Sequence, residues 1–391
     1  MSDASLERLL AQCQTMLSSD YLASAFKDKI NSLQNAGTLT KKQADSYLSL
    51  HEKLIHTCVF PSYQTLSEKL SALKSSGKND RGLAGFPDGT AYYHYLIQSQ
   101  VGDFRSVKEI EERLFTQLAL DYRQMQTLLS QNPSLAQNLS VFSLSATPKE
   151  MLSYLSKAMR TDFPDLDSPK YEVKYVPESM EEFSSPAFYL TPPADTLSPN
   201  TIYINRSSQV NPAELFTTLA HEGFPGHLYQ TLYYGNQNPA PIRNLLGCSG
   251  YIEGWATYVE SISYGYAASH FKVEPELLQL LWQNRSISLC LYSLLDIKIH
   301  EYGWTLAQVT QSLHGFGIAS DDTCKEIYQY IIENPANYLK YYLGYLNFMD
   351  LRDLAKKKAG DTFDKKEFHR FVLETGPAPF PIIEKYVLEK Y

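Results

Sequence analysis

The pattern of apolar and polar positions predicts a protein built mostly from helices. Between residues 3 and 74 apolar side chains recur at helical spacing, beginning with Leu6, Leu9 and Leu10, which indicates several amphipathic helices. Residues 274–302 are helical in pattern and strongly apolar, which indicates a buried central helix. Strands and helices do not alternate along the chain, so a parallel α/β sheet is not expected.

Several helix starts are marked by capping residues. Ser106 and Thr147 are each followed three residues later by a glutamate, the pattern of a capping box, and a proline directly follows Thr147. Asn211 precedes Pro-Ala-Glu in the same way. Further helices are expected from Gly250 onward and over residues 334–358, where tyrosine is frequent.

Residues 170–206 have a different character. Three short β-rich stretches begin at Tyr171, Ala187 and Thr201 and are separated by Pro, Ser and Asp, which predicts a small antiparallel sheet. Such a sheet, placed just before the next helix, could offer an edge strand to an extended peptide. The alternative is a purely structural ribbon, and the pattern does not separate the two.

Composition excludes some functions. The 391 residues carry a net charge of −8 and show no basic cluster, so nucleic acid is not an expected partner. Five scattered cysteines form neither a metal motif nor a disulfide framework. The polar N-terminus does not read as a signal peptide, and no apolar run reaches membrane-spanning length. Location stays open: cytoplasmic, or extracytoplasmic if an upstream segment is missing.

The stretch around His221, Glu222 and His227 carries candidate metal chemistry. The zinc-peptidase motif H-E-x-x-H places two histidines four residues apart on one helix face, whereas these two are six apart, roughly 240° on an ideal helix. Pro225 and Gly226 lie between them and predict a distortion that lets both imidazoles reach one ion. The alternative interpretation is two ordinary histidines beside a helix stop.

A catalytic zinc has three protein ligands and a water. His221 and His227 leave one place, and we predict that Glu253, 26 residues after His227, fills it. Glu222 is then free to act as general base on the water. The predicted cofactor is therefore Zn²⁺, and the alternative for Glu253 is a surface carboxylate.

Other polar residues are candidates for positions around the reacting carbonyl. Tyr341 or His300 could donate to the oxyanion, with Asp296 orienting His300 from one turn away. On the 334–358 helix Tyr345 and Arg352 share a face with Tyr341, and Arg352 could bind a substrate carboxylate. The alternatives are core packing for the tyrosines and, favoured by pattern alone, a buried structural pair of Asp296 and His300 that Arg285 could join.

These motifs resemble the bacterial DUF885 (domain of unknown function eight-eight-five) family. Its hallmark H-E-x-x-P-G-H matches residues 221–227, and its E-G-W-A-x-Y-x-E matches residues 253–260. Many relatives have a second histidine directly after the one that matches His227, where this chain has Leu228. The resemblance covers roughly residues 80–391. Two further matching sets are Arg285, Asp296, His300, Trp304 and Pro335, Tyr341, Gly344, Arg352.

The resemblance implies a zincin-like metallopeptidase of the gluzincin clan. The expected fold is mostly α (α+β), a multi-helix zincin-like fold with a small antiparallel sheet, similar to thermostable carboxypeptidases and oligopeptidases. We expect one catalytic unit over residues 1–391, with a helical lobe at 1–165 and a zinc-site lobe at 166–391. The latter holds the sheet (170–206), the metal helices (212–265) and the C-terminal helices. Glu260, which ends the second motif, is expected to lie behind the metal ligands.

The leading hypothesis is a zinc-dependent metallopeptidase that hydrolyses peptide bonds, of oligopeptidase or carboxypeptidase type. A peptide is then the expected partner, and the oligomeric state is left open. One alternative is a metallohydrolase of a non-peptide amide or ester. Another is a non-catalytic zincin-like binding protein, although the presence of Glu222 argues against it.

Overall fold

The computed structural model describes residues 3–77, 79–135, 146–207 and 211–391. The chain divides into two compact units, Met1–Asp80 and Arg81–Tyr391. The predicted boundary at residue 165 therefore falls inside the second unit. The reason is packing: helix α6 (Val107–Gln131) lies against α12 (Pro275–His300), so residues before 165 share a core with residues far downstream.

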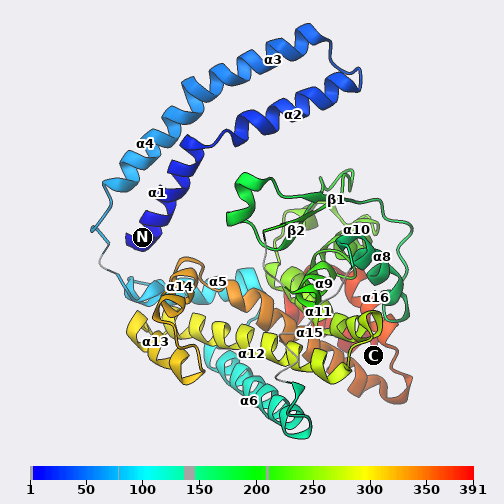
Figure 1. The fold of residues 1–391 in the computed structure, drawn as a ribbon. Helices are drawn as coiled ribbons and strands as arrows, with labels where there is room; N and C mark the ends of the chain where they lie inside the picture. The colour runs from blue at the N-terminus through cyan, green and yellow to red at the C-terminus, as the bar shows by residue number, and fades with distance from the viewer. Residues whose placement is uncertain (1–2, 78, 136–145, 208–210) are drawn as a thin grey trace. The chain divides into compact units, whose positions relative to one another are not determined.

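The first unit is wholly helical over its described residues. Helices α1 and α4 pack together around Leu6, Cys13 and Leu70, and α2 packs along α3, as Figure 1 shows. The amphipathic pattern predicted these helices. Each has an apolar stripe on one side only, and a neighbouring helix is needed to bury it. Their bounds are α1 Asp3–Ser18, α2 Tyr21–Asn35, α3 Lys41–Leu54 and α4 Phe60–Ser71.

The second unit is organised around three long helices, α11 (Ser249–Phe271), α12 and α15 (Asn337–Ala359), which pack against one another. Trp255 and Tyr258 on α11 are fully buried at the centre of its main core. Besides α6, the other α-helices in the described residues of this unit are α5 Gly89–Leu96, α8 Pro148–Ala158, α9 Pro212–Glu222, α10 His227–Gly235, α13 Leu306–Gly315, α14 Asp321–Glu333, α16 Lys365–Thr375 and α17 Phe380–Lys390.

A pair of glycines lets α11 and α15 approach each other closely. A Cβ atom on Gly254 of α11 would lie 2.4 Å from the carbonyl carbon of Gly344 of α15, so only glycine lets the two backbones approach this closely. Each glycine lies within a few residues of a candidate site residue, Glu253 on α11 and Tyr341 on α15. The close contact between α11 and α15 therefore brings Glu253 and Tyr341 to one end of the residue cluster that is described below.

The predicted helix starts are confirmed. Ser106 and Thr147 each accept a hydrogen bond from the backbone N–H three residues on, while Glu109 and Glu150 reach back to the caps. Asn211 caps α9 in the same way, through the N–H of Glu214. These local bonds satisfy backbone donors that a helix leaves unpaired, which is why sequence alone locates them.

The small sheet is present, but it is mixed and not antiparallel. Its order is β1 (Glu172–Tyr175), β3 (Thr201–Ile204), β2 (Ala187–Leu190), with β1 parallel and β2 antiparallel to β3. Strand β3 is central because it is the most buried of the three. The alternation of apolar and polar residues along a strand shows which residues face the core, but it does not show whether neighbouring strands run parallel or antiparallel. The prediction of a purely antiparallel sheet was therefore wrong. Strand β2 packs against α9.

Candidate metal centre

The segment between the two histidines breaks the helix completely. Helix α9 ends at Glu222 and α10 begins at His227, so the predicted bulge within one helix is a joint between two helices. The indole N–H of Trp255 donates to the carbonyl of Pro225 at 3.0 Å and holds the joint. A Cβ atom on Gly226 would lie 1.7 Å from the carbonyl oxygen of His221, so the joint folds back onto the last turn of α9.

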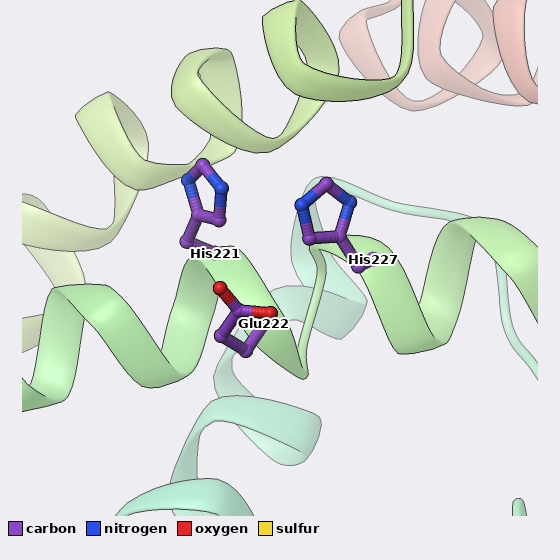
Figure 2. A group of neighbouring side chains, drawn as sticks. All are labelled: His221, Glu222 and His227. Carbon is purple, nitrogen blue, oxygen red and sulfur yellow. The ribbon is translucent and has the colours of Figure 1, made fainter. Parts of the chain in front are cut away.

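This joint brings the two imidazoles together, as the sequence predicts. The rings of His221 and His227 have centroids 4.8 Å apart and lie nearly perpendicular. Ligand atoms of His221, Glu222 and His227 all lie within 4.8 Å of one another, the one such group of potential metal ligands in the described part of the chain. Figure 2 shows the two rings facing each other across a gap, with the Glu222 carboxylate beside them.

Glu253 approaches the same point from α11. Its Oε2 atom lies 3.3 Å from Nε2 of His227 and 3.6 Å from Nε2 of His221. This oxygen is buried and has no hydrogen-bond partner, although buried polar atoms are almost always satisfied. Two ligands of a tetrahedral zinc, each about 2.0–2.1 Å from the ion, lie roughly 3.3 Å apart. The two distances from Glu253 Oε2 are therefore close to the ligand spacing of a tetrahedral zinc.

Glu222 has a different environment, although it belongs to the same cluster. Its Oε2 atom accepts the backbone N–H of Tyr189 at 2.8 Å. Tyr189 lies on β2, an outer strand of the sheet, so strand and helix together fix this carboxylate. Because the unpartnered oxygen is that of Glu253, the position of Glu253 fits the predicted third ligand, and Glu222 lies beside it.

Glu260 lies behind His221, as predicted. Its Oε2 atom is 3.2 Å from Nδ1 of His221, and its Oε1 atom accepts Nε–H of Arg285 at 3.1 Å. In the neutral ring, Nδ1–H of His221 donates to this buried carboxylate, and Nε2 then carries the lone pair that could bind an ion. The pattern did not identify Arg285 as the partner of Glu260; it had suggested a link with Asp296.

The electrostatics of this cluster favour positive charge. Burial is the largest influence on His221 and lowers its pKa, but Glu253 and Glu260 outweigh burial and raise the pKa to about 10. Burial likewise raises the pKa of Glu253, and the two imidazoles outweigh it and hold the pKa well below its ordinary value. Buried carboxylates on both sides of one imidazole are stabilised by a cation, either a proton on His221 or a metal ion.

Two cavities meet at the cluster. The larger, of about 780 Å³, is lined by His221, Glu222, His227 and Glu253. The second, of about 610 Å³, is also lined by His221 and Glu222. Tyr341 lines both cavities, and its ring stacks near that of His221 with centroids 6.2 Å apart. Volumes of this size accommodate small-molecule or short peptide ligands.

Tyr341 is therefore the one oxyanion-donor candidate that the structure brings to the cluster. Burial and the nearby Glu253 raise the pKa of Tyr341, so its phenol keeps its proton over the ordinary pH range. A protonated phenol at the meeting point of two cavities can donate a hydrogen bond to a ligand oxygen.

His300 requires a correction. It is fully buried, its Nδ1 atom accepts the backbone N–H of Leu83 at 3.1 Å, and its Nε2–H donates to the carbonyl of Ile331 at 3.0 Å. Both ring nitrogens are thus committed to the backbone, and burial lowers the pKa of His300 to about 4, which keeps the ring neutral. His300 lines neither cavity and ties together segments of the core.

Asp296 does not orient His300 either. Its Oδ1 atom accepts Tyr93 Oη–H at 2.5 Å and the backbone N–H of Ala336 at 3.0 Å. The structural role that the pattern favoured for this pair is therefore found, but with different partners. Spacing along a helix placed Asp296 and His300 near each other and could not show the neighbouring helices that take up their hydrogen bonds.

Tyr345 and Arg352 are also corrections. Tyr345 is buried in the core between Trp282 and Tyr342, and Arg352 pairs with Asp353 on the surface of the same helix. Neither residue lines the two cavities. The prediction considered only which residues share one face of an isolated helix. In the structure α11 and α12 both pack against α15, so only the end of α15 that carries Tyr341 reaches the cluster.

The fold and the cluster define a mostly helical protein with a small mixed sheet and a candidate metal centre. The chain belongs to the family described as "Bacterial protein of unknown function (DUF885)", whose model matches residues 1–387. This confirms the family that the motifs resemble. No curated protein matches the chain.

Two solved structures share the fold. The crystal structure of a "putative lipoprotein from Colwellia psychrerythraea" superposes with a TM-score of 0.85 at 22% identity, covering 100% of this chain and 70% of that one. A "putative lipoprotein of unknown function from Shewanella oneidensis" gives 0.64 at 17% identity, covering 99% and 73%. Within the described residues of this chain, no helix is both long and apolar enough to cross a bilayer.

Proposed function

We propose that this protein is a zinc-dependent metallopeptidase of the zincin type. The observation that carries the proposal is the convergence of His221 Nε2, His227 Nε2 and the unpartnered Glu253 Oε2 on one point, with a second carboxylate alongside. Three protein ligands and an accessible fourth direction are typical of a catalytic zinc, whereas a structural zinc is closed by four. The adjoining cavities supply that access.

The residues around this point have different roles in the proposed reaction. His221, His227 and Glu253 would hold a zinc ion, which would act there as a Lewis acid. Glu222 accepts the proton of the attacking water and passes it to the leaving amine. Tyr341 donates its hydroxyl proton in a hydrogen bond to the oxygen that gains negative charge. Glu260 and Arg285 hold the His221 ring in orientation.

The decisive experiment replaces Glu222 by Gln. The amide keeps the shape of the side chain but does not accept the proton, so hydrolysis of a peptide library should fall by about 10²–10⁴-fold. The zinc content of the purified protein should stay unchanged, because Glu222 is not a ligand in this assignment. The exposed Glu276→Gln variant is the matched control and should behave as the wild type.

Other outcomes lead to other functions. Full activity in Glu222→Gln contradicts the mechanism. Zinc-dependent turnover of small esters or amides, with the peptide library left intact, favours a non-peptide metallohydrolase. A protein that binds zinc and turns over neither class of substrate is a binding protein with this fold.

A further inference from the structure

A single arginine stands in the larger cavity without an acidic partner. Arg243 lies in the short 3₁₀ turn Pro241–Asn244, and it is the one lysine or arginine among the described residues that line this cavity. Its Nη2–H groups donate to the carbonyls of Thr375 at 2.8 Å and Pro377 at 2.9 Å. No carboxylate among the described residues lies within ion-pair distance of it.

These two hydrogen bonds position the guanidinium without neutralising it. Peptide carbonyls carry no net charge, so the positive charge of Arg243 remains available, and the side chain is half-buried and held in place. A guanidinium has five N–H donors in a planar fork, and two acceptors leave others unused. A carboxylate is the group that fits such a fork in two parallel bonds.

The arginine of the other cavity is different. Arg285 lines the smaller cavity, but Glu260 accepts its Nε–H, and Glu214 lines the same space. Each cavity is lined by three acidic side chains and one arginine, so the two differ in that the arginine of the smaller cavity is paired with a carboxylate and Arg243 is not. An extended ligand that passes the cluster meets an arginine already paired with Glu260 in one cavity and an unpaired guanidinium in the other, which gives it a preferred direction.

A second unpaired donor lies in the larger cavity. Gln230 follows His227 by one turn of α10, is 4% exposed, and lines the same cavity. Its Nε2 atom is buried and has no hydrogen-bond partner among the described residues. An unmet donor this close to a histidine of the cluster fits a ligand that brings acceptor oxygens into this cavity.

We infer that Arg243 recognises the free C-terminal carboxylate of a peptide substrate. This inference rests on the proposed function and makes it specific: the larger cavity receives the C-terminal side of the cleaved bond, so the enzyme removes a short fragment from that end. Arg243 takes the role that the sequence had suggested for Arg352. The size of the cavity, about 780 Å³, limits the fragment to a few residues.

The test uses one acetylated pentapeptide library prepared in two forms, with a free C-terminal carboxylate and with a C-terminal amide. Wild-type zinc-loaded protein should cleave the acid form with a kcat/KM roughly 10- to 100-fold higher, the range expected for a charge-assisted hydrogen bond. In Arg243→Gln this ratio should fall to near one, mainly through KM. Arg243→Lys keeps the charge and should retain part of the preference.

The control variant is Arg206→Gln. Arg206 is exposed, lies over the ring of Tyr175 and lines neither cavity. The acid-to-amide ratio of kcat/KM in Arg206→Gln should therefore stay at the wild-type value. Thermal melting of all variants shows whether loss of the bonds to Thr375 and Pro377 has unfolded Arg243→Gln. If Arg243→Gln has unfolded, the acid-to-amide ratio of kcat/KM in Arg243→Lys tests the inference in its place.

A binding experiment separates this inference from the proposed function. Zinc-loaded Glu222→Gln protein, with and without Arg243→Gln, selects peptides from both libraries, and mass spectrometry counts those retained. If the acid library is captured preferentially, and only when Arg243 is present, the inference is supported. This holds even if the wild type hydrolyses nothing, and then only the peptidase proposal fails. Cleavage or capture that ignores the C-terminal carboxylate overturns the inference and leaves the peptidase proposal standing.

Discussion

The Glu260 carboxylate contacts Nδ1 of His221 at 3.2 Å, on the opposite side of the ring from Nε2, which faces Glu253. Burial raises the pKa of Glu260, but the charge of Arg285 and the contact with His221 outweigh it and keep the carboxylate ionised. An ionised, buried acceptor behind a metal-binding histidine fixes its tautomer and increases its basicity.

Replacing Glu260 by Ala should therefore weaken zinc binding by about 10- to 100-fold. The change also leaves His221 Nδ1–H and Arg285 without their partner, so the protein should lose stability. Glu260→Gln retains an acceptor oxygen and should recover part of the affinity. Chelator competition measures the zinc dissociation constants, and equal constants for the wild type and Glu260→Ala would contradict this role.

Tyr341→Phe tests the oxyanion donor. It removes one hydroxyl from the meeting point of the two cavities, and kcat should fall by about 10²–10³-fold while zinc content is unchanged. Tyr345→Phe is the matched control, because that ring lies in the core four residues further along the same helix. Its kcat should stay close to the wild-type value. Equal kcat values for the two variants would remove Tyr341 from the mechanism.

Gly226→Ala tests the joint between α9 and α10. The added Cβ would meet the carbonyl oxygen of His221 at 1.7 Å, so the joint must move, at a cost of about 3 kcal/mol or more in stability. Because the joint aligns the two imidazoles, zinc affinity should fall as well. Gly265→Ala is the control: nothing lies within 4 Å of its added Cβ, and alanine stabilises a helix interior by roughly 0.5–1 kcal/mol.

Metal removal should lower stability as well as activity. Three side chains from three helices converge on one point, so an ion bound there links α9, α10 and α11 and binds only the folded chain. Free zinc at about 100 times its dissociation constant should add roughly 2.7 kcal/mol to the free energy of unfolding. Thermal melting with chelator and with graded zinc measures this effect, and a melting temperature that ignores zinc would argue against the site.

His369 gives a pH prediction. It is fully buried; its Nδ1–H donates to the carbonyl of Asp162 and its Nε2 accepts Tyr258 Oη–H. Burial lowers the pKa of His369 to about 3. Between pH 6.5 and 3 the unfolded chain binds a proton that the folded chain does not, so stability is full above pH 6.5 and falls as pH decreases.

The measurement is urea unfolding of the wild type and His369→Gln at several pH values between 7.5 and 4.5. Glutamine can donate to one of these partners and accept from the other but does not titrate, so the variant should lose less stability on acidification. The difference in slope should grow below pH 6.5. Parallel slopes would mean that His369 titrates normally in the folded protein.

The sequence by itself determined what depends on neighbours along the chain. The helix caps at Ser106, Thr147 and Asn211, the apolar helices, and the break imposed by Pro225 and Gly226 are all local consequences of residue type. The spacing of residues 221–227 and 253–260 also identified the family, because several motifs in a fixed order are specific.

Only the tertiary structure decided which side chains meet. Tyr341, Tyr345 and Arg352 lie on one helix, yet Tyr341 alone reaches the cavities, since Tyr345 is buried in the core and Arg352 pairs with Asp353 at the surface. His300 is bound to backbone groups more than 30 residues before or after it, and Arg243 owes its fixed position to carbonyls 132 and 134 residues downstream. Helical spacing defines a face; the long-range packing of other elements against that face determines whether it is buried, paired or open to a ligand.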